Sequence, residues 1–168
     1  SPSLNVGTGD FTLDGCVKTT ANHAPEGMVI AAKDVPDVGP GYHIAISATN
    51  KANCGVRDYN AAMTDPDWVE LAGTTVLNDG NWHHIRCQRA GSMLQLYADG
   101  VMEASASILP SLATLDSTKP FVVGVRVDPP GSVGNPMAFL VASTSVCSRK
   151  VGHRLSGGSI SFMTQLRK

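Results

Sequence analysis

Short apolar runs that alternate with polar residues and end at turn-forming dipeptides place the strongest constraint on the fold of this chain. In residues 11–18, Phe11 and Leu13 alternate with Thr12 and Asp14, which is the two-residue period of a β-strand. Nowhere do apolar residues recur at helical spacing for three full turns, so the pattern predicts an all-β protein. Further strands are expected at residues 42–46, 54–59, 82–89, 93–98, 101–107, 121–127, 137–147 and 159–166.

Turn-forming residues are spread along the whole chain, with 17 glycines and 10 prolines between the expected strands. Asp99-Gly100 is typical of a type I′ hairpin turn, because Asp and Gly tolerate the positive φ angles that this turn requires. Short strands at this spacing indicate a sandwich or a barrel. We expect the core to contain Phe11, Trp82, Ile85, Cys87, Leu94 and Leu96.

The length of 168 residues suits one domain, so we predict a single domain over residues 1–168. Thirteen basic and 14 acidic side chains leave a net charge of −1, which is unlike the basic surface of a nucleic-acid-binding protein. No apolar run approaches the roughly 18 residues of a transmembrane helix, so we expect no membrane insertion. Because the chain starts at Ser1 without an initiating Met, we expect it to be a piece of a longer polypeptide.

Four cysteines, Cys16, Cys54, Cys87 and Cys147, are 38, 33 and 60 residues apart. The lack of a C-x-x-C pair disfavours a zinc or iron–sulfur site. A chain of this length can fold without disulfides, and Cys16 and Cys87 lie in apolar strand-like runs. We therefore favour free, buried thiols over disulfides. On this interpretation the cysteines indicate neither an oxidising nor a reducing compartment for the protein.

Two segments in the middle of the chain resemble a known family. Residues 77–89, which contain Trp82-His83-His84, and residues 94–100, Leu-Gln-Leu-Tyr-Ala-Asp-Gly, are similar to the central signature of laminin-G-like domains in the concanavalin A-like lectin/glucanase superfamily. Residues 9–18 and 120–124 resemble two more strands of that family. The resemblance implies a two-sheet antiparallel jelly-roll sandwich with adjacent first and last strands. Cys16 stands where the family usually carries a Trp.

The resemblance also implies a function. Domains of this family bind glycans, proteins and lipids, and some only build structure. Of these uses, we expect a non-catalytic recognition or adhesion module that binds a glycan, or a protein, on a cell surface or polymer outside the cell. An alternative from another class is a structural protein of a virion or surface filament, such as a phage decoration or tail protein, which assembles as a homo-oligomer. Retention on a glycan array would favour the first function, whereas concentration-dependent assembly without such retention would favour the second.

The sequence lacks the motifs of common hydrolases, and we predict that the protein is not an enzyme. A glycoside hydrolase needs two carboxylates that face each other across a cleft. The three glutamates, Glu26, Glu70 and Glu103, occur in no pattern that puts two carboxylates on one strand face. Neither a Gly-x-Ser-x-Gly motif nor a phosphate-binding loop is present.

Two adjacent histidines, His83 and His84, follow Trp82. Neighbouring residues of a strand point to opposite faces, so the two imidazoles cannot bind one metal ion together. We expect one histidine to pack inward with its ring hydrogen-bonded, and Trp82 to fill the core.

The polar segment 58–70 is the predicted ligand site, because loops on a rigid sandwich commonly carry function. Trp68 and Tyr59 offer flat rings on which a sugar can stack, and Asp58 and Asn60 can form hydrogen bonds at the edge of the sugar. These residue types suit a neutral glycan better than an anionic one.

The same segment offers oxygen ligands for calcium at Asp65 and Asp67, and Asp34 with Asp37 is a weaker candidate. No other cofactor is expected. The alternative interpretation is structural: Asp65-Pro66 resembles the cap and first position of a helical turn, with Trp68 folded onto the sandwich.

Overall fold

The computed structural model describes residues 4–23, 25, 27–33, 40–58, 67–108, 114–124 and 161–167. These residues form ten strands and no α-helix. The strands are β1 (Phe11–Lys18), β2 (Met28–Ala32), β3 (Gly41–Ile46), β4 (Lys51–Asp58), β5 (Asp67–Val76), β6 (Trp82–Ala90), β7 (Met93–Ala98), β8 (Val101–Ser107), β9 (Val122–Val123) and β10 (Ser161–Arg167). No helix in the described part of the chain is long and apolar enough to cross a membrane.

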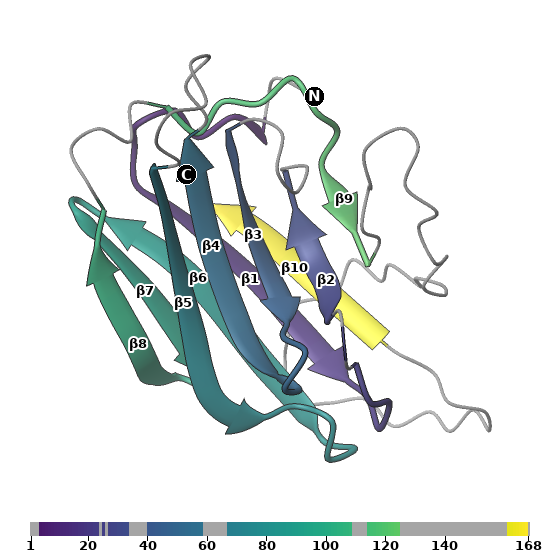
Figure 1. The fold of residues 1–168 in the computed structure, drawn as a ribbon. Helices are drawn as coiled ribbons and strands as arrows, with labels where there is room; N and C mark the ends of the chain where they lie inside the picture. Colours follow the sequence, from purple (N-terminus) through teal and green to yellow (C-terminus); the bar gives the residue numbers. More distant parts are fainter. Residues whose placement is uncertain are drawn as a thin grey trace.

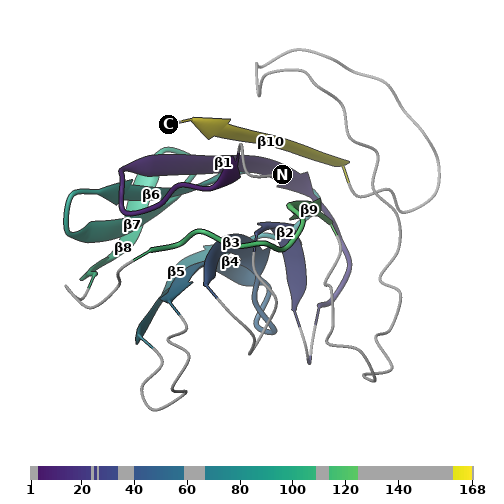
Figure 2. The same cartoon turned by 90° about the horizontal axis from the view of Figure 1, so that it is seen from above.

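Two antiparallel five-stranded sheets are stacked face to face (Figures 1 and 2). One sheet has the order β10-β1-β6-β7-β8 and the other has the order β5-β4-β3-β2-β9. The predicted all-β sandwich is confirmed. The first and last strands are adjacent, as the family resemblance implied, because β1 and β10 pair from Thr12 opposite Arg167 to Lys18 opposite Ser161.

Two strands of the structure were not predicted from the sequence. β2 was not expected at all, and β5 begins at Asp67, inside the segment predicted as a polar loop. In β5, Val69 and Leu71 lie opposite Val56 and Cys54 of β4. The acidic residues around Trp68 made this segment resemble a polar loop, so the alternation of its apolar residues was not recognised as a strand. The strand expected at residues 121–127 is limited to β9 among the described residues, and the one expected at 137–147 lies outside them.

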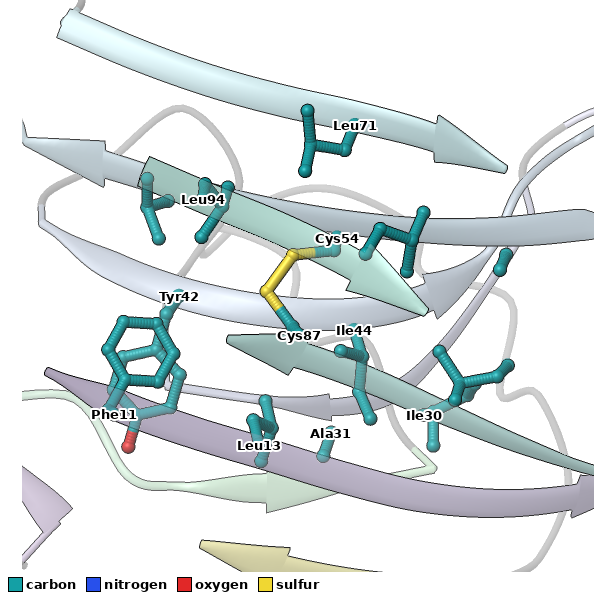
Figure 3. Packing of buried hydrophobic residues seen from close by; sticks show 14 of the residues in the cluster. Phe11, Leu13, Ile30, Ala31, Tyr42, Ile44, Cys54, Leu71, Cys87 and Leu94 are labelled. Atoms are coloured by element: carbon teal, nitrogen blue, oxygen red, sulfur yellow. A yellow bond between two sulfur atoms is a disulfide. The ribbon is translucent and has the colours of Figure 1, made fainter. Parts of the chain in front are cut away.

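The core lies between the sheets and is built from alternate residues of their strands (Figure 3). Five residues predicted for the core are buried there: Phe11, Ile85, Cys87, Leu94 and Leu96.

The prediction for Trp82 is wrong, because the side chain is 51% exposed. The cause is the two-residue period of β6. His83, Ile85 and Cys87 point inward, so Trp82 lies on the opposite, outer side together with the other even-numbered residues of the strand.

The expectation of free thiols is also wrong. Cys54 of β4 and Cys87 of β6 form a disulfide that joins the two sheets through the core, with their Cα atoms 5.7 Å apart (Figure 3). Cys16 is disulfide-bonded as well. The pairing of Cys54 with Cys87 could not be predicted from the sequence, because only the stacking of the two sheets brings these residues, 33 positions apart, into contact.

The carboxylate of Glu103 connects the two sheets at one edge of the sandwich. Glu103 of β8 accepts hydrogen bonds from the backbone N–H groups of Thr74 and Thr75 in β5, each at 3.0 Å, and from both threonine hydroxyls. Burial alone raises the pKa of Glu103, but these hydrogen bonds outweigh it and lower the pKa below 4.5. Glu103 therefore links the edge strands of the two sheets.

Candidate functional site

An exposed aromatic ring marks the outer side of the β5-β4-β3-β2-β9 sheet. Trp68 lies near the start of β5, the edge strand of this sheet, and is 50% exposed. Arg57 of β4 is its partner in the strand register, and the guanidinium carbon lies 5.5 Å from the centre of the Trp68 ring. This cation–π contact covers one face of the indole from the side of β4. No described strand lies on the other side of β5.

A hydrogen-bonded row crosses three strands next to this ring. Asn53 Nδ2 donates to Glu70 Oε1 at 2.7 Å, and His43 Nε2 lies 3.0 Å from Asn53 Oδ1. Because the Asn53 amide turns its nitrogen toward Glu70, its oxygen is the acceptor and His43 Nε2 is the donor. Glu70 thus lies exposed on β5, two residues after Trp68 on the same strand face, with one carboxylate oxygen held in place.

A glycine makes room for this row. Gly55 lies between His43 and Glu70 in the register of β3, β4 and β5. A Cβ atom at Gly55 would overlap Cε1 of the His43 ring, so the imidazole lies directly against the β4 backbone. A side chain here would push the ring away from Asn53. We call the six residues involved the β3–β5 face: His43, Asn53, Gly55, Arg57, Trp68 and Glu70.

The predicted ligand residues are only partly placed by the described chain. Trp68 is exposed, as a stacking role requires. Asp58 ends β4, and its Oδ2 accepts a hydrogen bond from the Thr114 backbone at 3.4 Å, so that oxygen anchors the segment before β9. Tyr59 and Asn60 lie outside the described residues. Their roles in binding stay predictions.

The structure contradicts a helix that continues past residue 66, whereas Asp65 and Pro66 themselves lie outside the described residues. A helix capped at residue 65 would continue through residues 67 and 68, but both belong to β5. Trp68 does not fold onto the sandwich either, because half of its surface is exposed.

The predicted calcium ligands are not brought together in the described part of the chain. Asp67 opens β5 opposite Asp58, whereas Asp65, Asp34 and Asp37 lie outside the described residues. Within those residues no group of three His, Cys, Asp or Glu side chains is arranged to hold a metal ion. Calcium binding stays a prediction.

Four residues of the β3–β5 face were not singled out for binding by the sequence analysis: His43, Asn53, Arg57 and Glu70. The sequence pattern of β4 already indicated two of them, Asn53 and Arg57. In β4, Asn53, Gly55 and Arg57 are spaced by two and alternate with the apolar residues Cys54 and Val56, which predicts that they share the side of the strand opposite to the core. Asn53 is itself only 8% exposed on that side. The pairing of β4 with β5 was needed to add Glu70, because strand register is a long-range property.

The histidine pair has a structural role. His83 is buried, and its ring nitrogens lie 2.8 Å from Asp99 Oδ2 and 3.0 Å from Asp79 Oδ1. The expectation of one inward, hydrogen-bonded histidine is confirmed. Asp99 and Gly100 have φ angles of 52° and 84°, as the predicted turn requires. The signature shared with the laminin-G-like family therefore ties two turns, at residues 79–80 and 99–100, to one buried imidazole.

The two carboxylates favour the protonated imidazole. Burial alone lowers the pKa of His83, but the hydrogen bonds to Asp99 and Asp79 outweigh it and raise the pKa above 6.5. The backbone N–H of Asn81, aided by His83 and the Asn81 amide, lowers the pKa of Asp79 to about 2. The carboxylate of Asp79 is therefore available to His83 throughout the neutral range.

This geometry predicts a pH dependence of stability. A raised pKa in the folded state means that the contribution of His83 is complete below pH 6.5 and is lost as the pH rises through the raised value. Between about pH 6 and pH 8, the free energy of unfolding should therefore fall more steeply for the wild type than for His83→Gln. Buried His23, whose pKa is lowered, titrates with the opposite sign. Because His23 is present in both proteins, urea unfolding of the pair isolates His83, and parallel pH profiles would contradict the prediction.

The outer side of the other sheet carries paired charges. Asp14 Oδ1 accepts a hydrogen bond from Arg86 Nε at 2.7 Å and lies 2.9 Å from His84 Nε2. Burial raises the pKa of Asp14, but its contacts with His84 and Arg86 outweigh this effect and lower it. Exposed Trp82 belongs to the same side of β6. Asp14 on this side is paired with an arginine and a histidine, whereas the described partner of Glu70 is the neutral amide of Asn53.

Structures of similar fold include domains of a laminin chain and a module of a sialidase. Domains LG4-5 of the mouse laminin α1 chain match with a TM-score of 0.57 and 13% sequence identity, over 76% of this chain and 32% of that chain. This chain thus spans about a third of the laminin structure. The CBM40 module of Ruminococcus gnavus IT-sialidase matches with a TM-score of 0.55 and 13% identity, over 96% of this chain and 76% of that chain. Its complex with α2,6 sialyllactose matches with a TM-score of 0.54 and 14% identity, over 76% of this chain and 70% of that chain.

At these identities the structural likeness establishes the fold alone. No curated protein matches the sequence. The family model described as the concanavalin A-like lectin/glucanases superfamily, of laminin-G type, matches residues 1–151, most of the chain. The two sheets, the adjacent terminal strands and this match agree, and the chain belongs to the concanavalin A-like lectin/glucanases superfamily.

Proposed function

We propose that this protein is a non-catalytic carbohydrate-binding module whose binding site is the β3–β5 face. The observation that carries the proposal is the exposed Trp68 ring beside a carboxylate, Glu70, that Asn53 holds in place. An indole can bury the apolar C–H surface of a sugar ring, while neighbouring polar groups form hydrogen bonds at its edge. Both requirements are met within one strand face.

The related structures support a sugar-binding use of this sandwich. The CBM40 module is a part of a sialidase and has been captured with sialyllactose. Because its identity to this chain is only 14%, the ligand itself does not transfer. The identity of the sugar must be argued from the residues of the β3–β5 face.

The arrangement of carboxylates supports a binding role over hydrolysis. A retaining glycosidase places two carboxyl groups roughly 5 Å apart, and an inverting one separates them by about 6.5–9.5 Å. Glu70 is the one carboxylate among the outward side chains of β3, β4 and β5 that the structure describes. The Glu103 carboxylate already accepts hydrogen bonds from Thr74 and Thr75 at the edge of the sandwich. Turnover of a polysaccharide that disappeared in a Glu70 or Glu103 variant would contradict this part of the proposal.

We also propose that the module lies outside the cell, where its partner is a glycan or a protein on a surface. The disulfide between Cys54 and Cys87 supports this placement, because disulfides persist in oxidising compartments.

The decisive experiment compares the two exposed tryptophans. Trp68→Ala should weaken glycan binding by about 1–3 kcal/mol, because the stacking surface is lost, and should leave the melting temperature nearly unchanged. Trp82→Ala is the matched control, since Trp82 is equally exposed but lies on the other sheet. It should change neither quantity. Affinity is measured by calorimetry on a ligand selected from a glycan array, and an unchanged affinity of Trp68→Ala would contradict the site.

The same samples test the rival functions. A virion or filament protein should assemble with increasing concentration and retain no glycan, which sedimentation measurements and the array would show. Calcium can be added or chelated in the titration. A loss of affinity on chelation would support ligands at Asp65 and Asp67.

A further inference from the structure

We propose that Glu70 is the specificity-determining residue of the β3–β5 face and selects a neutral sugar, by accepting hydroxyl hydrogen bonds and by repelling acidic sugars. The inference rests on the proposed function and deepens it, because it names the class of ligand.

The spacing of Trp68 and Glu70 fits one sugar ring. Residues i and i+2 on one face of a strand lie about 6.8 Å apart, so a ring stacked on Trp68 brings its edge hydroxyls within reach of the Glu70 carboxylate. The ligand approaches from the open side of β5, because the Arg57 guanidinium already covers the face of the indole that is turned toward β4.

The carboxylate is oriented before any ligand arrives. Oε1 accepts from Asn53, and the oxygen of the Asn53 amide is held by His43. The His43 ring is in turn held against Gly55. Three strands therefore fix one side chain, which lowers the ordering cost of binding. Asn53 acts through Glu70 and is a positioning residue.

The remaining oxygen defines what can bind. Glu70 is exposed, and its Oε2 has no partner among the described residues. A carboxylate offers only acceptors, so the ligand must present donors such as hydroxyl groups. A sugar carboxylate or sulfate in this place would bring like charges together, and such a juxtaposition disfavours the wrong partner strongly.

The test uses an array of matched pairs, in which each neutral oligosaccharide is accompanied by its uronate, sialylated and sulfated counterparts. The wild type should bind neutral members at least about tenfold more tightly than acidic members, in line with a charge-assisted hydrogen bond. Glu70→Gln, which keeps the shape and removes the charge, should reduce this ratio about tenfold or more. Asp10→Asn changes the net charge equally at an exposed site outside the face and should leave the ratio unchanged.

Asn53→Ala provides a second readout that a purely structural role would not move. It should reduce the neutral-to-acidic ratio in the same direction as Glu70→Gln, and the double variant should reduce it no further than Glu70→Gln alone. A ratio that falls additively in the double variant would overturn the positioning role.

The outcomes separate this inference from the proposed function. If Trp68→Ala abolishes binding while Glu70→Gln leaves the ratio unchanged, or if the wild type prefers acidic sugars, the inference is overturned and the binding site stands. If neither variant changes binding, or if the wild type retains no glycan, both are overturned.

Discussion

Replacing Cys54 and Cys87 together by alanine should lower the free energy of unfolding by about 3–4 kcal/mol. The disulfide closes a loop across a sequence separation of 33 residues, and restricting a loop of that length in the unfolded chain accounts for a value of this size. Both cysteines are fully buried, so the alanines leave no unpaired polar group in the core. Urea unfolding of the double variant and the wild type measures the difference.

Reduction of the wild-type protein provides a control. Reduction of the wild type should destabilise it further than the double variant is destabilised, because Cys16 is also disulfide-bonded. A double variant within about 1 kcal/mol of the wild type would mean that packing alone holds the two sheets together. Cys54 lies between Asn53 and Gly55 on β4, so the disulfide also anchors the strand that carries the centre of the β3–β5 face.

The sequence predicted the class of fold because alternation is a local property. Residues 11–14 and Met93–Ala98 show the two-residue period, and Asp99-Gly100 forms the hairpin turn between β7 and β8. The same rule, applied consistently along β6, would have excluded Trp82 from the core, because Ile85 and Cys87 share the other side of the strand.

The disulfide and the candidate site depended on contacts between distant segments, which periodicity cannot supply. Trp68 was predicted either to stack on a sugar or to fold onto the sandwich, and the structure leaves it half exposed. Its surroundings were predicted from the neighbouring sequence, whereas in the structure the nearest polar groups come from β4, opposite in register. Arg57 and Asn53 could join Trp68 in one hypothesis only after the pairing of β4 with β5 was known.

Tyr42→Ala should destabilise the fold by about 3–5 kcal/mol, the range for removing a buried aromatic ring. Tyr42 of β3 is fully buried, and its ring centre lies 5.2 Å from that of Phe11 in the facing sheet and 6.4 Å from that of Phe121. The ring therefore fills the space between the two sheets near one end of the core. Its hydroxyl donates a hydrogen bond of 2.6 Å to the Leu4 carbonyl, and burial raises the pKa of this hydroxyl.

Tyr42→Phe separates the ring from the hydroxyl. It should lower the free energy of unfolding by only about 1–2 kcal/mol, because the aromatic contacts remain and only the hydrogen bond to Leu4 is lost. Since His43 follows Tyr42 on β3 and points to the other side of the sheet, this variant should leave glycan affinity unchanged. Equal destabilisation by Tyr42→Phe and Tyr42→Ala would show that the hydrogen bond to Leu4, and not the packing of the ring, stabilises this end of the core.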